Sequence, residues 1–302
     1  MSGWDVELLF ARDVRDRRVI ARDRDRGIVT RVRHGVYIAT ASIKDLGVED
    51  KHIVAARAVA ATSDRPLVFS HWSAAVLLDV DALAARLGTV HLTFADPGAR
   101  GLEKVSGHVF ALRGEEITEK NGLLVTGIGR TVVDIAGSGS FGDGVVAADS
   151  ALRAGVPREM LELAVDLAGP RRASKHIVRV VTFADGDSGS AGESLSRVGM
   201  DVMGLHPVLQ RRHFDHLGYI GRSDFYFPDC EAVGEFDGRV KFADPRFAPN
   251  GAGEVLWAEK VREDRMRAVN KGFGRWGWPE ANDPRKLAPV LRAAGVSVPK
   301  RF

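Results

Sequence analysis

The strongest constraint on the fold is a segment of alternating polar and apolar side chains, residues 221–241. Successive side chains of a strand point to opposite faces, so the segment predicts two strands that pair around a turn at residues 228–231. Glu235 and Asp237 then share one face of the second strand, and the pairing brings Asp224 beside them. The other positions are rich in Phe, Tyr and Val.

Three carboxylates on one side of a hairpin repel one another and require compensation. A divalent cation is the simplest candidate, because Mg²⁺ takes hard oxygen ligands from one or two carboxylates together with water and phosphate; Mn²⁺ is an alternative. A second interpretation stays open. A strand with one solvated face alternates in the same way without any functional reason, and Asp-Gly is an ordinary turn at the end of a strand.

Composition narrows the class of protein. The chain has 302 residues, 45% of them hydrophobic and 27% charged, which is ordinary for a globular protein of two or three domains. No run approaches the ~18 apolar residues that span a bilayer, and charge appears too early for a secretory signal. Cys230 is the only cysteine, which excludes disulfide frameworks and thiolate clusters. We expect a cytoplasmic protein without a membrane partner.

Residues 1–40 are expected to form a small DNA-binding unit. Between positions 12 and 33 there are nine Arg and four Asp, an excess of five positive charges. Arginine favours phosphate because its planar fork donates two hydrogen bonds at once. The alternative is a solvated helix with Arg–Asp pairs at i, i+3 or i+4.

Apolar residues at helical spacing predict a helix from about Trp4, and residues 28–38 predict a hairpin that turns at His34-Gly35. Helical structure followed by a basic two-stranded ribbon is the order of a winged helix. In that arrangement Arg31 and Arg33 of the wing contact phosphate.

Residues 41–182 predict a mixed α/β region that serves as scaffold or partner surface. His71 is either a functional base or a satisfied core histidine, and Arg130 is expected to pair with Asp134 at i, i+4. Residues 183–190, rich in Gly, Ser and Asp, mark a linker. Helices are expected at 49–62, 143–154 and 158–168, and strands at 89–95 and 108–113.

Residues 191–302 predict a further α/β domain. Its expected order is a helix with Glu193, a strand, the hairpin described above, a helix, a strand and a last helix. Outside the hairpin, the helices are expected at 192–198, 254–270 and 286–294, the strands at 208–211 and 273–278, and a loop at 244–253.

Two family resemblances follow from these motifs. The wing sequence RVRHGVYI, with FSHWSAA at 69–75, VHLT at 90–93 and VTGIGRTVVD at 125–134, resembles AbiEi-type antitoxins, which are transcriptional autorepressors of type IV toxin–antitoxin systems. This resemblance implies operator DNA and a cognate toxin as partners. The segments GES, RSDFYFPD, GEFDGRVKF and EKVREDRMR resemble, in that order, the PD-(D/E)XK nuclease fold of domains similar to very-short-patch repair endonucleases.

The second resemblance implies a restriction-endonuclease-like α/β/α domain. Asp224 and Glu235 would hold the metal, Glu193 would support it through water, and the Phe236 carbonyl would be a further ligand. The lysine that usually ends the family's third motif is Asp237 here. Lys241, four residues on, has the strand parity to replace it.

The chain is thus expected to be an α/β multidomain protein with one of two functions. One is a metal-dependent DNA endonuclease, in defence or repair, in which Lys241 or Asp237 orients or deprotonates the attacking water. The other is a non-catalytic AbiEi-like antitoxin or transcriptional repressor. Flanking phosphates would be held by Arg222, Arg239 and Arg275, and a base of a frayed or single strand would stack on Trp276 or Trp278.

Overall fold

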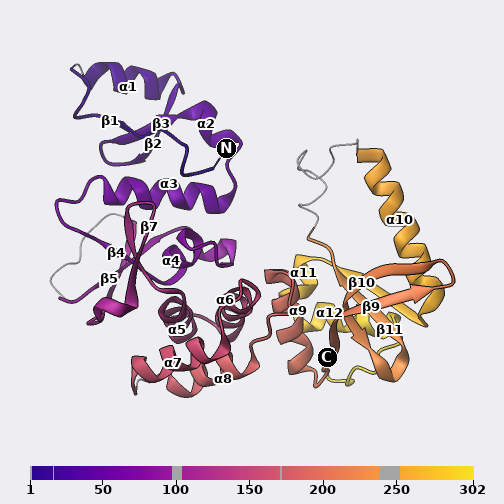
Figure 1. Ribbon diagram of the computed structural model, residues 1–302. Coiled ribbons are helices and arrows are strands. Elements are labelled where there is room, and N and C mark those ends of the chain that lie inside the picture. The colour runs from indigo at the N-terminus through magenta and orange to yellow at the C-terminus, as the bar shows by residue number, and fades with distance from the viewer. Residues whose placement is uncertain (1, 16, 97–103, 171, 239–251) are drawn as a thin grey trace. The chain divides into compact units, whose positions relative to one another are not determined.

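The protein is described by a computed structural model (Figure 1). It covers residues 2–15, 17–96, 104–170, 172–238 and 252–302, with the backbone alone for residues 17 and 252–256. The chain divides into two compact units, unit 1 (Met1–Ala147 and Val156–Thr182) and unit 2 (Ala148–Gly155 and Phe183–Phe302). The expected mixed α/β class is confirmed. The division into three domains at residues 40, 182 and 191 remains a prediction.

The first sheet of unit 1 is a basic ribbon with one added strand, in the order β1-β3-β2. The predicted hairpin is confirmed, because β2 pairs antiparallel with β3. Gly35 makes the turn with φ +75°, a left-handed conformation that favours glycine. The elements are β1 (Leu9–Phe10), α1 (Arg17–Asp25), β2 (Val29–Arg33) and β3 (Val36–Ala39).

The helix expected from Trp4 is wrong. Leu9 and Phe10 instead form β1, which pairs with β3. The apolar residues expected on one helix face have other contacts: Val6 packs with Ile38 and with Val54 of α3 (Val48–Ala60) in a buried cluster. Tertiary packing against the ribbon therefore overrode the local helical spacing.

The second sheet of unit 1 has five strands in the order β6-β5-β4-β8-β7. Its strand β6 begins and ends earlier than the expected 108–113. The fully buried Phe69, Leu92 and Val125 come from three neighbouring strands, and they lie side by side in the sheet because Phe69 pairs with both of the others. The strands are β4 (Val68–Phe69), β5 (Val90–Phe94), β6 (Val105–Val109), β7 (Ile117–Lys120) and β8 (Leu123–Thr126).

The other described elements of unit 1 are helices and short 3₁₀ turns. The ion pair expected between Arg130 and Asp134 is confirmed, since Arg130 Nε donates to Asp134 at 2.8 Å. Arg130 Nη1 also donates to Glu116 at 2.8 Å. The elements are α2 (Thr40–Lys44), α3 (Val48–Ala60), α4 (His71–Leu77), η1 (Ala84–Arg86), η3 (Gly114–Glu116), α5 (Ile128–Ser138), α6 (Phe141–Arg153, which continues into unit 2), α7 (Arg158–Ala168) and α8 (Ser174–Phe183). Helix α8 was not predicted.

Unit 2 is built on a four-stranded sheet in the order β12-β11-β10-β9. Strands β9, β10 and β11 are antiparallel, and β12 returns parallel to β11. A parallel return needs a crossover, which α10 supplies. The elements are α9 (Ala191–Val202), β9 (Val208–Asp215), β10 (Gly218–Phe227), η4 (Pro228–Cys230), β11 (Ala232–Phe236), α10 (Ala252–Val269), β12 (Gly272–Trp276), α11 (Trp278–Ala281) and α12 (Pro284–Ala293).

The strand alternation places helices on both faces of this sheet. On one face Tyr226 and Val233 pack with Met266 of α10. On the other, Trp276 stacks on Phe225 and donates from Nε1 to Ser196 of α9 at 2.8 Å. Unit 2 therefore has helix, sheet and helix layers, as Figure 1 shows.

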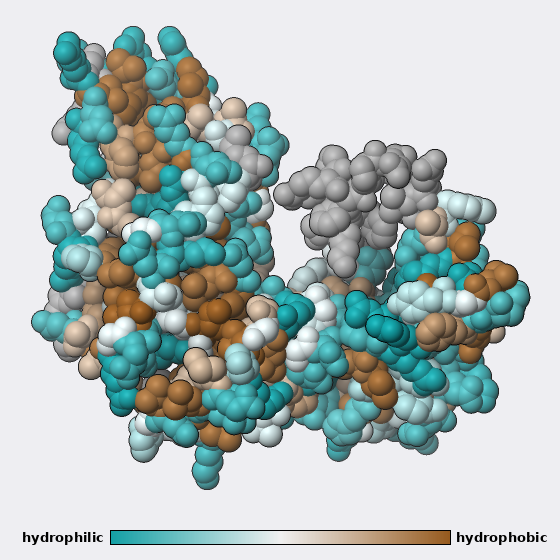
Figure 2. All heavy atoms as spheres, in the orientation of Figure 1, coloured by the Kyte–Doolittle hydropathy of each residue, from teal (hydrophilic) through white to brown (hydrophobic). Residues whose placement is uncertain are grey.

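Exposed apolar residues gather at the far end of the β9–β10 hairpin. Phe214 and Leu217 are 60% and 72% exposed, and the Phe214 ring lies 5.4 Å from that of Tyr219. Figure 2 shows this end of the hairpin as a hydrophobic patch. As for membranes, none of the helices in the described part of the chain has the length and apolarity to cross a bilayer.

Two glycines of β12 give a matched test of this packing. A Cβ at Gly272 would overlap the backbone carbonyl of Ala294, whereas one at Gly274 would meet the Ala294 Cβ at an ordinary 3.4 Å. We expect Gly272→Ala to lower the free energy of unfolding by about 1–3 kcal/mol and Gly274→Ala to change it by less than about 1 kcal/mol. Chemical denaturation measures both, and equal effects would contradict the close approach.

Candidate functional site

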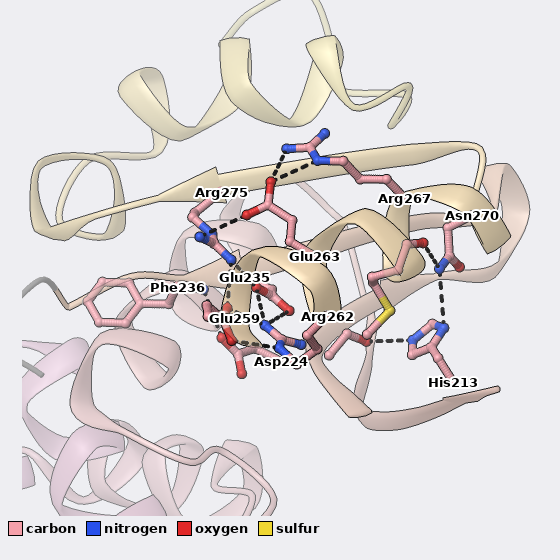
Figure 3. Close-up of polar contacts among 12 residues, drawn as sticks. His213, Asp224, Glu235, Phe236, Glu259, Arg262, Glu263, Arg267, Asn270 and Arg275 are labelled. Atoms are coloured by element: carbon pink, nitrogen blue, oxygen red, sulfur yellow. Dashed lines mark hydrogen bonds and ion pairs between the residues drawn. The ribbon is translucent and has the colours of Figure 1, made fainter. Parts of the chain in front are cut away.

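A pocket of about 460 Å³ in unit 2 gathers most of the predicted site residues. In the β10–β11 ladder Phe225 faces Gly234, so Asp224 and Glu235 are the next positions on the two strands. Figure 3 shows their carboxylates close together beneath α10. The charged and aromatic lining residues are Glu193, Arg222, Asp224, Glu235, Phe236, Asp237, Glu259, Arg262, Arg275 and Trp278.

Glu193 closes the N-terminal end of α9. Its Oε2 accepts from Gly189 N at 2.7 Å and from Gln210 Nε2 at 3.1 Å, and its Oε1 accepts from Ser190 Oγ at 2.9 Å. The Ser190 hydroxyl in turn accepts from Glu193 N at 3.3 Å. A carboxylate is stabilised here by the unpaired amides of the first turn. Glu193 therefore has a complete structural role in addition to its place in the pocket.

Asp224 joins the two strands of the hairpin. Its Oδ2 accepts from the backbone N–H of Phe236 at 2.8 Å. The Phe236 ring packs on Gly192 of α9, where a Cβ would overlap it. These contacts fix the orientation of the Asp224 carboxylate at the end of β11, where the predicted Glu-Phe-Asp segment leaves the sheet.

Glu235 is only 6% exposed, and two arginines hold it. Arg262 Nη2 donates to Oε1 at 2.9 Å and Oε2 at 3.0 Å, and Arg275 Nη2 donates to Oε2 at 2.9 Å. Arg275 is the parallel ladder partner of Glu235, while Arg262 comes from α10. Both also contact Glu259, and Arg275 contacts Glu263 at 3.0 Å (Figure 3).

The ion pairs keep this network charged. The hydrogen bond to Glu259 is the main cause that raises the pKa of Arg262, and the same bond lowers the pKa of Glu259. Burial lowers the pKa of Arg275, but the hydrogen bond and charge of Glu235 outweigh it, so that its pKa is raised. Among the described residues that line the pocket, five carboxylates face three guanidinium groups, which gives this set a net charge of −2.

The donors fit a hard divalent cation in kind. Carboxylate oxygens are the ligands that Mg²⁺ and Mn²⁺ prefer, and acidic side chains outnumber basic ones in the lining. In the described arrangement, however, both Glu235 oxygens accept from arginine, so coordination by Glu235 requires at least one guanidinium to move. Within the described ranges no group of three or more His, Cys, Asp or Glu stands ready as a metal site.

The remaining predicted residues separate into three groups. Asp237 and the exposed Arg222 line the pocket, whereas Arg239 and Lys241 lie outside the described residues. Trp278 is 39% exposed and lines the pocket, but Trp276 is 3% exposed and belongs to the core. Stacking of a nucleic-acid base on Trp276 is therefore wrong as an expectation.

Sequence reasoning missed Arg262 and Glu259. The sequence predicted a helix at 254–270 and assigned neither residue a role in the site. The signal was present in their i, i+3 spacing, which allows a pair on the helix surface. Only the packing of α10 on the sheet shows that this pair faces Glu235.

The wing arginines belong to unit 1. Arg31 is exposed on β2, and Arg33 is partly buried at the end of that strand. Both line a smaller pocket in unit 1, together with Lys104.

A histidine cluster occupies another part of unit 1. The His71 and His108 rings stack at 3.5 Å between centroids, and His91 Nδ1 lies 2.9 Å from His108 Nε2. His71 is 4% exposed and contacts the hydroxyls of Ser70 and Ser138, which favours the satisfied core histidine over the base. Burial is the main cause that lowers the pKa of His91 to about 4, with His108 next, and burial also lowers the pKa of His108.

Comparison with known proteins adds no family assignment. No family model matches the chain, and no curated protein matches it in sequence.

The arginine network predicts unequal effects for two residues of α10. Arg262→Met leaves the buried Glu235 with fewer donors, so we expect a loss of about 1–3 kcal/mol in the free energy of unfolding. Arg267 pairs with Glu263 and has a half-exposed side chain, so Arg267→Met should cost less than about 1 kcal/mol. Urea denaturation monitored by tryptophan fluorescence compares them, and a loss no larger for Arg262→Met would contradict the network.

The histidine cluster predicts acid sensitivity of unit 1. His91 has a pKa of about 4 in the folded protein and 6.5 as its ordinary value, so between these pH values the unfolded state binds more protons. The contribution of His91 to the free energy of unfolding should therefore be complete above pH 6.5 and should be lost towards pH 4, which lowers the free energy of unfolding by up to roughly 3 kcal/mol. We expect His91→Asn to flatten this dependence and the exposed His216→Gln to leave it unchanged, as measured by denaturation at each pH.

Proposed function

We propose that unit 2 binds DNA and hydrolyses its phosphodiester bonds as a metal-dependent endonuclease of the PD-(D/E)XK type. One observation supports this more than any other. Glu193 of α9, Asp224 of β10, Glu235 of β11 and Asp237 line one pocket, and among its described lining residues carboxylates outnumber guanidinium groups five to three. A structural core has little reason to concentrate negative charge in this way, whereas a site for a cation and a phosphate does.

Asp224 and Glu235 would hold the cation, and Glu193 would support it through water. A bound Mg²⁺ or Mn²⁺ supplies a lowered pKa for an attacking water and neutralises charge that develops on the phosphate. The Phe236 N–H fixes the Asp224 carboxylate by its 2.8 Å hydrogen bond. That constraint favours a preorganised site, because the carboxylate loses little further freedom when it binds.

The other lining residues have roles that follow from their chemistry. Asp237 accepts a proton from the attacking water or orients it. Arg222, which is exposed, donates to a flanking phosphate. Trp278 offers a partly exposed ring on which a base of a frayed or single strand can stack.

The second candidate function is a non-catalytic antitoxin or transcriptional repressor similar to the AbiEi type. The observation that favours it is the pairing of Glu235 with Arg262 and Arg275, which compensates the carboxylate without a cation. In this alternative unit 2 only binds, the basic α1 and the β2–β3 ribbon contact operator phosphates, and a cognate toxin is the protein partner.

Asp224→Asn separates the two functions. It keeps an oxygen that can accept from Phe236 N but removes the negative charge, so we expect Mg²⁺- or Mn²⁺-dependent nicking of supercoiled plasmid to fall at least about 100-fold (~2.7 kcal/mol). Glu235→Gln should have the same effect. The control is Asp229→Asn, an exposed carboxylate in the turn of the same hairpin, which should cut like the unmodified protein.

Linear duplex and single-stranded DNA are tested beside the plasmid, and circular dichroism checks that each variant is folded. Cleavage that survives Asp224→Asn and Glu235→Gln would exclude this pocket as the active site. An absence of cleavage under all conditions, with salt-sensitive duplex binding retained, would favour the repressor.

A further inference from the structure

The smaller pocket of unit 1 has a volume of about 90 Å³ and a one-sided charge. Among the described residues that line it, Arg31, Arg33 and Lys104 are charged, and none of these described residues has a carboxylate. The rest of the wall is largely apolar, with Val59, Leu87 and Val90. Positive charge next to apolar side chains is less well screened than at an open surface.

Arg33 has an unsatisfied donor in this pocket. Its Nη1 is buried and has no hydrogen-bond partner in the described part of the chain. Buried guanidinium donors are almost always paired, and an unpaired one is a common mark of a missing water or ion. In this case the missing partner must be an acceptor, because guanidinium only donates.

The backbone of β2 is irregular next to Arg33. Arg31 pairs with Tyr37 and Arg33 with Val36, so the ladder has a bulge between the two arginines. Val32 packs into the apolar cluster of Val6 and Ile38. A bulge alters the local twist of a strand, and Arg31 and Arg33, which flank this one, both line the pocket.

His52 lines the same pocket but supplies neither charge nor a donor. Its Nδ1 lies 2.9 Å from the Leu87 carbonyl, which can only accept, so Nδ1 carries the proton. Its Nε2 lies 2.8 Å from Ser73 Oγ and accepts a hydrogen bond from that hydroxyl. Burial lowers the pKa of His52, which keeps the ring neutral. The positive charge of the pocket therefore comes from the arginines and the lysine.

We propose that this pocket binds a phosphate-type oxyanion, with Arg33 as the inner donor and Arg31 and Lys104 as flanking cations. The volume exceeds the ~10–15 Å³ that one water needs and leaves room for a single tetrahedral anion. Free phosphate and a phosphodiester of nucleic acid share this chemistry. The inference is independent of hydrolysis in unit 2.

The test uses the full chain, inorganic phosphate as the probe, and the variants Arg33→Met and Arg26→Met. Arg26 is an exposed arginine of the same unit and serves as the charge-matched control. By calorimetric titration we expect Arg33→Met to weaken phosphate binding at least about 10-fold and Arg26→Met to change it less than about twofold. In phosphate-free buffer Arg33→Met should have a Tm equal to or above that of the unmodified protein, since it removes an unpaired buried donor.

A duplex-binding measurement by fluorescence anisotropy identifies the source of the anion. If Arg33→Met weakens duplex binding about 10-fold more than Arg26→Met, the pocket takes a backbone phosphate of DNA. If it removes phosphate binding but leaves duplex binding equal to the control, the ligand is a small phosphate compound.

Three results would overturn the proposal. The first is that Arg33→Met binds phosphate as well as the unmodified protein does, and the second is that Arg33→Met has a lowered Tm in phosphate-free buffer. The third is that the unmodified protein binds no phosphate and both variants bind duplex DNA equally. Asp224→Asn, tested for cleavage, reports on unit 2 and does not enter this comparison.

Discussion

A carboxylate that is 6% exposed within a sheet must be both neutralised and hydrogen-bonded, and Glu235 meets this requirement through two arginines. One is its own ladder partner on β12, and the other reaches it from α10. The ion pair of Arg262 with Glu235 therefore helps to hold the crossover helix α10 over the sheet. Loss of either guanidinium would leave negative charge in a poorly solvated place.

The same constraint shapes the pocket. Strand alternation places Asp224 and Glu235 on the face that α10 covers, while Phe225 and Trp276 pack on the face of α9. The pocket thus forms where the α10 face of the sheet meets the start of α9. Five carboxylates and three arginines are among its described lining residues. Both proposed functions use this arrangement. They differ in whether the arginines release Glu235 when a phosphate and a cation bind, or hold it permanently.

Two arginines of unit 1 differ in how fully they are hydrogen-bonded. Arg130 is 4% exposed and is paired at 2.8 Å with both Glu116 and Asp134. Arg33 has a buried Nη1 without a partner among the described residues, and the described lining of its pocket holds no carboxylate. Full pairing is what a structural arginine needs. The contrast is the reason that Arg33, rather than Arg130, points to a ligand.

The sequence by itself determined the central hairpin of unit 2, most of its other helices and strands, and the identity of most lining residues, but it missed α11. The period-2 alternation of residues 221–237 is enough to predict the hairpin and the shared face of Asp224 and Glu235, because strand geometry fixes which side chains lie together. It also determined the i, i+4 pair of Arg130 and Asp134. Local spacing was insufficient to predict the structure from Trp4 to Phe10. The apolar residues there have helical spacing, but Leu9 and Phe10 form a strand that pairs with β3.

Tertiary structure decided what compensates the carboxylates. The repulsion among the carboxylates was evident from the sequence, but the groups that compensate it were not. Arg262 is 27 residues from Glu235 in the chain, and Arg275 is 40 residues from it. Likewise, the bulge that separates Arg33 from Arg31 depends on the pairing of β2 with β3. Such contacts depend on how α10, β12 and β3 pack, and packing follows from the whole chain rather than from any one segment.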